Sequence, residues 1–126
     1  MRELTAKNAE EKKAYVDFYP HAIDFEVTSF CNFECGMCPH SIVKNRLARH
    51  MNLNILERME PYLKHCSRVA LQGDGEPFLN PDIFRIISFF EQRGIRLTTT
   101  TNLSVMNTEI ADVIEKFILQ KEQFHK

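Results

Sequence analysis

The spacing of hydrophobic and polar residues predicts three short β-strands. In residues 22–28 every second side chain is apolar and those between are acidic or polar, the alternation of a strand with two different faces. Residues 68–72 form a second, mostly apolar run that ends at a glycine-containing turn. Residues 95–101 are rich in threonine, whose branching at Cβ favours extended backbone.

Helices are predicted between and after these strands, because apolar residues recur there at intervals of three and four. Asn54, Asn80 and Asn107 stand where helices would begin, and an asparagine side chain can accept a hydrogen bond from a free backbone N–H of the first turn. Gly94 stands where the second helix would end, and Pro61 predicts a kink in the first. The expected apolar stripes are Ile55, Met59, Tyr62 and Leu63; Ile83, Ile86, Ile87 and Phe90; and Ile110, Val113, Ile114, Phe117 and Ile118.

This order of elements, strand then helix three times over, predicts an α/β fold with a parallel sheet. Residues 21–126 would hold the three β–α units as one domain, preceded by a polar leader at residues 1–20. In a parallel sheet the carboxyl ends of the strands lie at one edge, where binding groups gather. The residues that follow each strand are therefore the first candidates for a site.

Composition narrows the class of protein. The formal net charge of the 126 residues is −1, so the composition lacks the excess of basic residues that is typical of proteins that bind nucleic acids or membrane surfaces. No apolar run approaches the length of a membrane span, and residues 1–13 are too polar for a signal peptide. We therefore expect a cytoplasmic protein, in which free cysteines favour metal binding over disulfides.

Three of the four cysteines follow the first predicted strand in the spacing C-x3-C-x2-C, at Cys31, Cys35 and Cys38. Scrambling a chain of this length and cysteine content gives that spacing in about 0.2% of cases. Three thiolates so close can converge on one inorganic centre, yet a 4Fe–4S cluster is normally closed by four. A cluster held by three would keep one iron open to another ligand, as catalytic metal centres do.

Two later motifs make the chain resemble the radical S-adenosylmethionine (radical SAM) superfamily. Residues 73–77, Gly-Asp-Gly-Glu-Pro, are similar to the Gly-Gly-Glu-Pro turn that follows the second strand in that family, and residues 100–102, Thr-Thr-Asn, to the element after the third. The whole pattern most resembles the branch with the SPASM-type peptide maturases and the molybdenum-cofactor cyclase. The resemblance implies the amino-terminal half of a partial (β/α)6 TIM-like barrel, with an unpaired edge at the third strand.

The resemblance also implies roles for individual residues. The three cysteines would ligate three irons of a 4Fe–4S cluster, and S-adenosylmethionine would chelate the fourth. Gly75 and Glu76 would hold its methionyl amino group, Met37 would contact adenine through its backbone, and Thr101 and Asn102 would lie close to the cofactor. The implied metal ligands are Cys31, Cys35 and Cys38, the implied cofactor contacts are Met37, Gly75, Glu76, Thr101 and Asn102, and no catalytic side chain is assigned.

The activity implied by the resemblance is reductive cleavage of S-adenosylmethionine to a 5′-deoxyadenosyl radical that abstracts hydrogen from an unidentified substrate, with a peptide as one candidate. The electron would come from a reductant such as flavodoxin or ferredoxin. Two alternatives stay open at this point. One is a structural zinc module of three cysteines with His40 or Cys66, and the other is a truncated chain that binds a cluster but is inactive.

Overall fold

The computed structural model describes residues 19–43 and 47–122, with side chains as far as residue 118. Its centre is a parallel sheet in the order β1-β2-β3, formed by β1 (Ala22–Phe25), β2 (Arg68–Leu71) and β3 (Arg96–Thr99). The predicted parallel β–α order is therefore confirmed. The predicted leader falls almost entirely outside the described residues.

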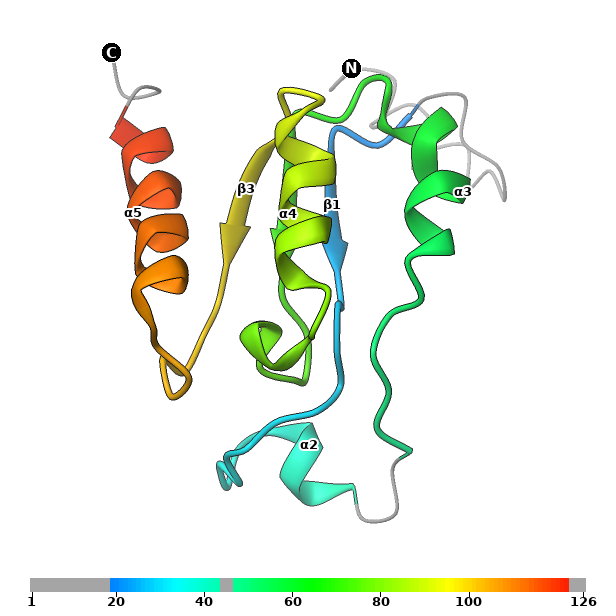
Figure 1. Cartoon of the computed structure of the whole chain (residues 1–126). Coiled ribbons are helices and arrows are strands. Elements are labelled where there is room, and N and C mark those ends of the chain that lie inside the picture. The colour runs from blue at the N-terminus through cyan, green and yellow to red at the C-terminus, as the bar shows by residue number, and fades with distance from the viewer. Residues whose placement is uncertain (1–18, 44–46, 123–126) are drawn as a thin grey trace, which may run out of the picture.

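Helices fill the connections between the strands. In Figure 1, α4 lies in front of the sheet, while α3 and α5 lie beyond β1 and β3. The arrowheads of β1 and β3 point towards the end of the molecule that carries α2 (Figure 1). None of the helices in the described ranges has the length and apolarity that crossing a bilayer requires. The elements are α2 (Pro39–Ile42) and α3 (Asn54–Leu63) before β2, the 3-10 helix η1 (Pro77–Leu79) and α4 (Ile83–Glu91) before β3, and α5 (Thr108–Glu122) after it.

The hydrophobic core lies between the sheet and the helices. Val69 of β2 and Leu97 of β3 are fully buried, and the ring of Phe25 meets the ring of Phe90 edge-on with centroids 5.5 Å apart. β2, flanked on both sides, is buried along most of its length, as expected for the central strand of a covered parallel sheet. Among the described strands β3 pairs only with β2, and a cavity of about 130 Å³ lies between β3 and α5.

The predicted apolar stripe is right for α4, right for most of α5, and half right for α3, where Leu63 and Met59 meet the core. All four stripe residues of α4 are buried, and in α5 Ile110, Val113 and Phe117 are buried while Ile118 is exposed. In α3 the buried residues are Leu56 and Leu63, whereas Ile55 and Tyr62 face solvent. Apolar residues stand side by side in this helix, as at Ile55 and Leu56, so two different helix faces are partly apolar. The spacing alone did not decide which face packs against the core. The helix continues through Pro61 to its last residue.

Two of the three predicted capping residues, Asn107 and Asn80, make a capping hydrogen bond. Asn107 accepts a hydrogen bond from the backbone N–H of Ile110 at 2.9 Å, as a capping residue does. Asn54 instead lies inside α3. Asn80 is buried just before α4, where its Oδ1 accepts the backbone N–H of Asp82 at 2.8 Å. Its side-chain nitrogen also donates to the carbonyl oxygen of Val27 at 2.6 Å. It ties the connection after β2 to the chain that follows β1.

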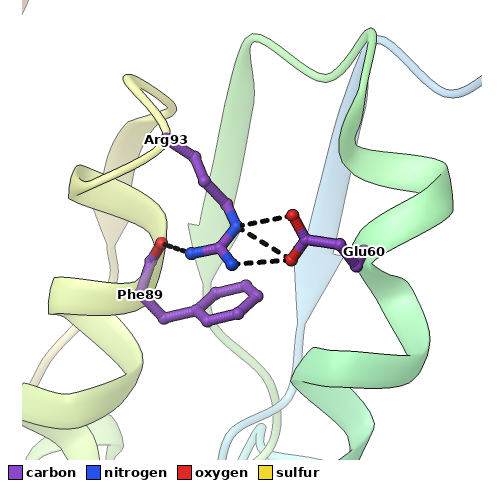
Figure 2. Close-up of polar contacts among 3 residues, drawn as sticks. All are labelled: Glu60, Phe89 and Arg93. Carbon is purple, nitrogen blue, oxygen red and sulfur yellow. Dashed lines mark hydrogen bonds and ion pairs between the residues drawn. The ribbon is translucent and has the colours of Figure 1, made fainter.

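An ion pair joins α3 to the end of α4 (Figure 2). The guanidinium of Arg93 donates from Nη2 to Oε2 of Glu60 at 2.6 Å and from Nε to both carboxylate oxygens. The same group lies 3.5 Å above the ring centroid of Phe89 and donates to the carbonyl oxygen of that residue at 2.6 Å. Geometry of this kind needs the planar fork of arginine.

We expect Arg93→Ala to lower the free energy of unfolding by about 1–2 kcal/mol, the combined size of a two-pronged surface ion pair and a cation–π contact. Arg93→Lys should lose most of the same amount, because an ammonium cannot form the fork. Urea denaturation monitored by circular dichroism measures both. Arg85→Ala is the matched control, because it removes an exposed ion pair between Arg85 and Asp82, which lie one helical turn apart. It should change the free energy of unfolding by less than about 0.5 kcal/mol. Equal effects at the two arginines would contradict this account.

Candidate functional site

A buried carboxylate links the turns that follow β2 and β3. The side chain of Glu76 is only 2% exposed. Its Oε1 accepts from the hydroxyl of Thr101 at 2.7 Å and from the backbone N–H of Phe78 at 3.2 Å. Its Oε2 accepts from the backbone N–H of Asn102 at 2.7 Å. Glutamate is rarely buried without such partners, and here two of the three lie on the turn of the neighbouring strand.

The turn after β3 is held in a strained conformation. The backbone N–H of Leu103 donates to Thr101 Oγ1 at 3.0 Å, and that of Ser104 donates to Asn102 Oδ1 at 2.9 Å. Between them Leu103 has φ of 59°, a left-handed conformation that a branched side chain disfavours. These bonds fix where the side chain of Asn102 points.

The turn after β2 is pressed against the chain that leads from β1 into the cysteines. A Cβ added at Gly75 would collide with the carbonyl oxygen of Thr28 and would lie 2.7 Å from that of Phe30. The next residue, Glu76, donates its backbone N–H to the Phe30 carbonyl at 2.8 Å. Glycine is therefore required at position 75 because the protein's own backbone comes so close.

The first strand is shorter than predicted, and its continuation has another partner. β1 ends at Phe25, and the next residues pair antiparallel with the segment around His50. Ser29 donates its backbone N–H to the Arg49 carbonyl at 2.9 Å, and Met51 donates to the carbonyl of Val27 at 2.9 Å. Sequence reasoning missed this pairing because the two segments lie about twenty residues apart and the segment around His50 shows no strand alternation. It closes the base of the loop that carries the three cysteines.

The three cysteines lie on this loop with free thiols. Cys31 and Cys38 are half-buried and Cys35 is exposed. Cys38 donates its backbone N–H to the Cys35 carbonyl at 2.9 Å, and its position is the N-cap of α2. The amide of Asn102 lies 3.9 Å from Cys31 Sγ, which brings the third turn against the first. Met37, on the same loop, is 89% exposed.

The predicted site residues thus fall into two groups. Glu76, Thr101 and Asn102 contact one another, Gly75 sits beside them, and Asn102 reaches Cys31. The remaining residues, Met37, Cys35 and Cys38, occupy the outer part of the same loop.

Cys66 is separate from this site. It lies just before β2, at the amino end of the sheet, and is only 8% exposed. Its thiol lies 3.2 Å from the carbonyl oxygen of Arg68. Burial raises the pKa of the Cys66 thiol, so this residue is a poor metal ligand and a weak nucleophile.

A comparison with protein families agrees with the arrangement of the three turns. Residues 25–120, which contain all three motifs, match the model of the radical SAM superfamily. The chain belongs to the radical SAM superfamily. A 4Fe–4S cluster and S-adenosylmethionine are the cofactors that belong to this enzyme family, as the motifs had implied.

Relatives of this radical SAM chain are longer than it is. It is 22% identical over 103 residues to the AdoMet-dependent heme synthase of Methanosarcina barkeri, covering 81% of this chain and 30% of that protein. BtrN, solved in complex with AdoMet and 2-DOIA, superposes with a TM-score of 0.67 at 21% identity, covering 81% of this chain and 44% of BtrN. Streptococcus suis SuiB, solved with S-adenosylmethionine, gives a TM-score of 0.65 at 24% identity, covering 91% and 26%. The chain therefore spans less than half of each, and the solved structures establish a shared fold.

The donor chemistry of the loop fits an iron–sulfur cluster. Three free, at least partly accessible thiols stand within eight residues, and thiolates are the ligands such clusters take. In the described ranges no three His, Cys, Asp or Glu side chains lie close enough to share one metal ion. Sulfurs bound to a single zinc lie within about 4 Å of one another, whereas the cysteines of a cubane each bind a different iron.

The zinc alternative finds no support in these positions. Cys66 lies at the opposite end of the sheet from the motif cysteines. His40 lies in α2, and its buried Nδ1 has no hydrogen-bond partner within the described part of the chain. Among the described residues, neither belongs to a group of three or more side chains placed to hold one metal ion.

We expect Gly75→Ala to lower the free energy of unfolding by about 1–3 kcal/mol, because the new methyl group must displace backbone that feeds the cysteine loop. Gly36→Ala is the matched control, since a Cβ at Gly36, inside the loop, meets nothing within 4 Å. It should stay within about 0.5 kcal/mol of the wild type. Chemical denaturation of both variants tests this, and comparable losses would show that the close packing at Gly75 is not what requires glycine.

Proposed function

We propose that Cys31, Cys35 and Cys38 bind three irons of a 4Fe–4S cluster and that S-adenosylmethionine occupies the fourth iron beside the Gly75–Glu76 turn. The observation that carries the proposal is the contact series from Glu76 through Asn102 to Cys31. In this series the Gly75–Glu76 turn and Cys31 lie on the same rim of the sheet, and both contact Asn102. A cluster on that loop would be next to the groups assigned to its second ligand.

Glu76 has two tasks in this proposal. Its carboxylate offers about four acceptor positions, and the hydroxyl of Thr101 and two backbone N–H groups use three of them. One position remains for the ammonium of the methionyl group, as a charge-assisted hydrogen bond. We therefore assign Glu76 first to holding the second and third turns together and then to orienting the cofactor.

The outer part of the cysteine loop completes the proposed site. Met37 exposes its side chain and leaves its backbone at the surface of the loop, where we propose that it meets the adenine. The hydroxyl of Thr101 already donates its hydrogen to Glu76, so we assign Thr101 to holding that carboxylate in place.

Together, a reduced cluster and S-adenosylmethionine supply reductive cleavage of the sulfonium to methionine and a 5′-deoxyadenosyl radical, which abstracts hydrogen from a substrate. The part of the protein is to hold both groups and keep water away. Because the chain spans less than half of its relatives, we propose this activity for the protein of which this fold is the cofactor-binding part.

A peptide is the substrate class we propose. One structure of SuiB with this fold was solved bound to the precursor peptide SuiA, at a TM-score of 0.62 to this chain. The motifs also resemble the SPASM branch, which contains peptide maturases. A reductant such as flavodoxin or ferredoxin in the cytoplasm would supply the electron.

Anaerobic reconstitution with iron and sulfide tests the proposal. We expect a brown protein with about four irons and four sulfides per chain. Adding S-adenosylmethionine should alter the electron paramagnetic resonance spectrum of the reduced cluster, because the open iron gains ligands.

Two cysteine variants provide the comparison. Cys35→Ala should lose the colour and the iron, whereas Cys66→Ala should keep both, since Cys66 is buried at the other end of the sheet. Zinc in place of iron, or a cluster that survives Cys35→Ala, would refute the ligand assignment. A cluster whose spectrum ignores S-adenosylmethionine would refute the open iron.

A further inference from the structure

The side-chain amide of Asn102 has a defined orientation. Its oxygen accepts the backbone N–H of Ser104 at 2.9 Å, so its nitrogen is on the other side. That nitrogen lies 3.1 Å from Oδ1 of Asn32 and 3.9 Å from Sγ of Cys31. An amide nitrogen carries two hydrogens, which is enough for both neighbours. A flipped amide would set its oxygen against a carbonyl oxygen and a sulfur and would lose the bond from Ser104.

The backbone of Asn102 is anchored as well. Its N–H donates to the buried carboxylate of Glu76 at 2.7 Å. Asn32, beside Cys31, makes a second bridge, because its amide nitrogen donates to the hydroxyl of Ser104 at 2.8 Å. The donor that faces the sulfur is therefore held by the fold at both its backbone and its side chain.

A donor fixed beside a metal-bound sulfur acts on the metal. A cluster gains negative charge when it takes up an electron, and an N–H group beside a ligating sulfur stabilises the more negative state. Hydrogen bonds to the sulfurs are one of the means by which proteins set the reduction potential of such a cluster.

We propose that Asn102 is a positioning residue that donates an N–H···S hydrogen bond to Cys31 and thereby raises the reduction potential of the cluster, an inference that rests on the proposed function. This role differs from the expected one, in which Asn102 contacts S-adenosylmethionine. It makes the turn after β3 part of the cluster's surroundings. It also connects Glu76 to the cluster, because Glu76 holds the backbone of Asn102, whose side chain donates the hydrogen bond.

The test is the midpoint potential of the anaerobically reconstituted protein, measured by a redox titration followed by electron paramagnetic resonance. Asn102→Leu has a similar shape and no donor. At the wild-type midpoint potential, we expect its ratio of reduced to oxidised cluster to fall roughly threefold, the size of one modest hydrogen bond. Asn102→Asp keeps the acceptor for Ser104 but replaces the donor with a negative charge, so its potential should fall further.

Ser104→Ala is the control. It removes the hydroxyl that meets Asn32 and leaves the Ser104 backbone N–H that orients Asn102. Its midpoint potential should stay close to that of the wild type and shift much less than that of Asn102→Leu, because Asn102 keeps its bonds to Glu76 and to the Ser104 backbone. An effect as large as that of Asn102→Leu would mean that the turn, and not the donor, sets the potential, and would overturn the inference.

The remaining outcomes separate the two proposals. A wild-type protein that assembles no cluster overturns the proposed function. Clusters in the wild type and both Asn102 variants with equal potentials overturn the role of Asn102 and leave the proposed function standing. If Asn102→Leu does not fold, the potential of Asn102→Asp decides, and a shift towards positive potential rejects the hydrogen bond.

Discussion

One buried carboxylate determines how the carboxyl ends of the strands are arranged. Glu76 is almost wholly buried. Its carboxylate accepts hydrogen bonds from its own turn and from Thr101 and Asn102 in the turn after β3. A buried carboxylate without such partners would be strongly destabilising, so the turns after β2 and β3 must stay together wherever Glu76 is buried. The parallel sheet brings the two turns to the same edge, and the carboxylate fixes their distance.

The cysteine loop depends on the same contact through two further links. Gly75 allows the second turn to pack against the carbonyl groups of Thr28 and Phe30, just before Cys31. Asn102, whose backbone is bound to Glu76, reaches the sulfur of Cys31. The three motifs that are separate in the sequence thus form one connected structure, and we propose that this structure holds the cluster and S-adenosylmethionine of the radical SAM family.

The sequence was informative where local rules dominate. The α4 stripe, the Asn107 cap and the three strand positions follow from periodicity and capping, and the cysteine, Gly-Glu-Pro and Thr-Asn motifs were assigned to the carboxyl rim from strand order alone. It was less informative where distant segments compete for the same groups. The pairing of Ser29 with Arg49, the use of Asn80 to tie down Val27 and the bond from Thr101 to Glu76 all join residues more than fifteen positions apart. Such bonds depend on the completed sheet, and no local pattern records them.

The measurement that tests this account most directly is a double-mutant cycle between Glu76→Gln and Thr101→Val, followed by urea denaturation. Because the hydroxyl donates to a buried carboxylate at 2.7 Å, we predict a coupling free energy of about 1 kcal/mol or more between the two positions. Effects that add to within about 0.3 kcal/mol would show that the two turns are held independently and would contradict the account.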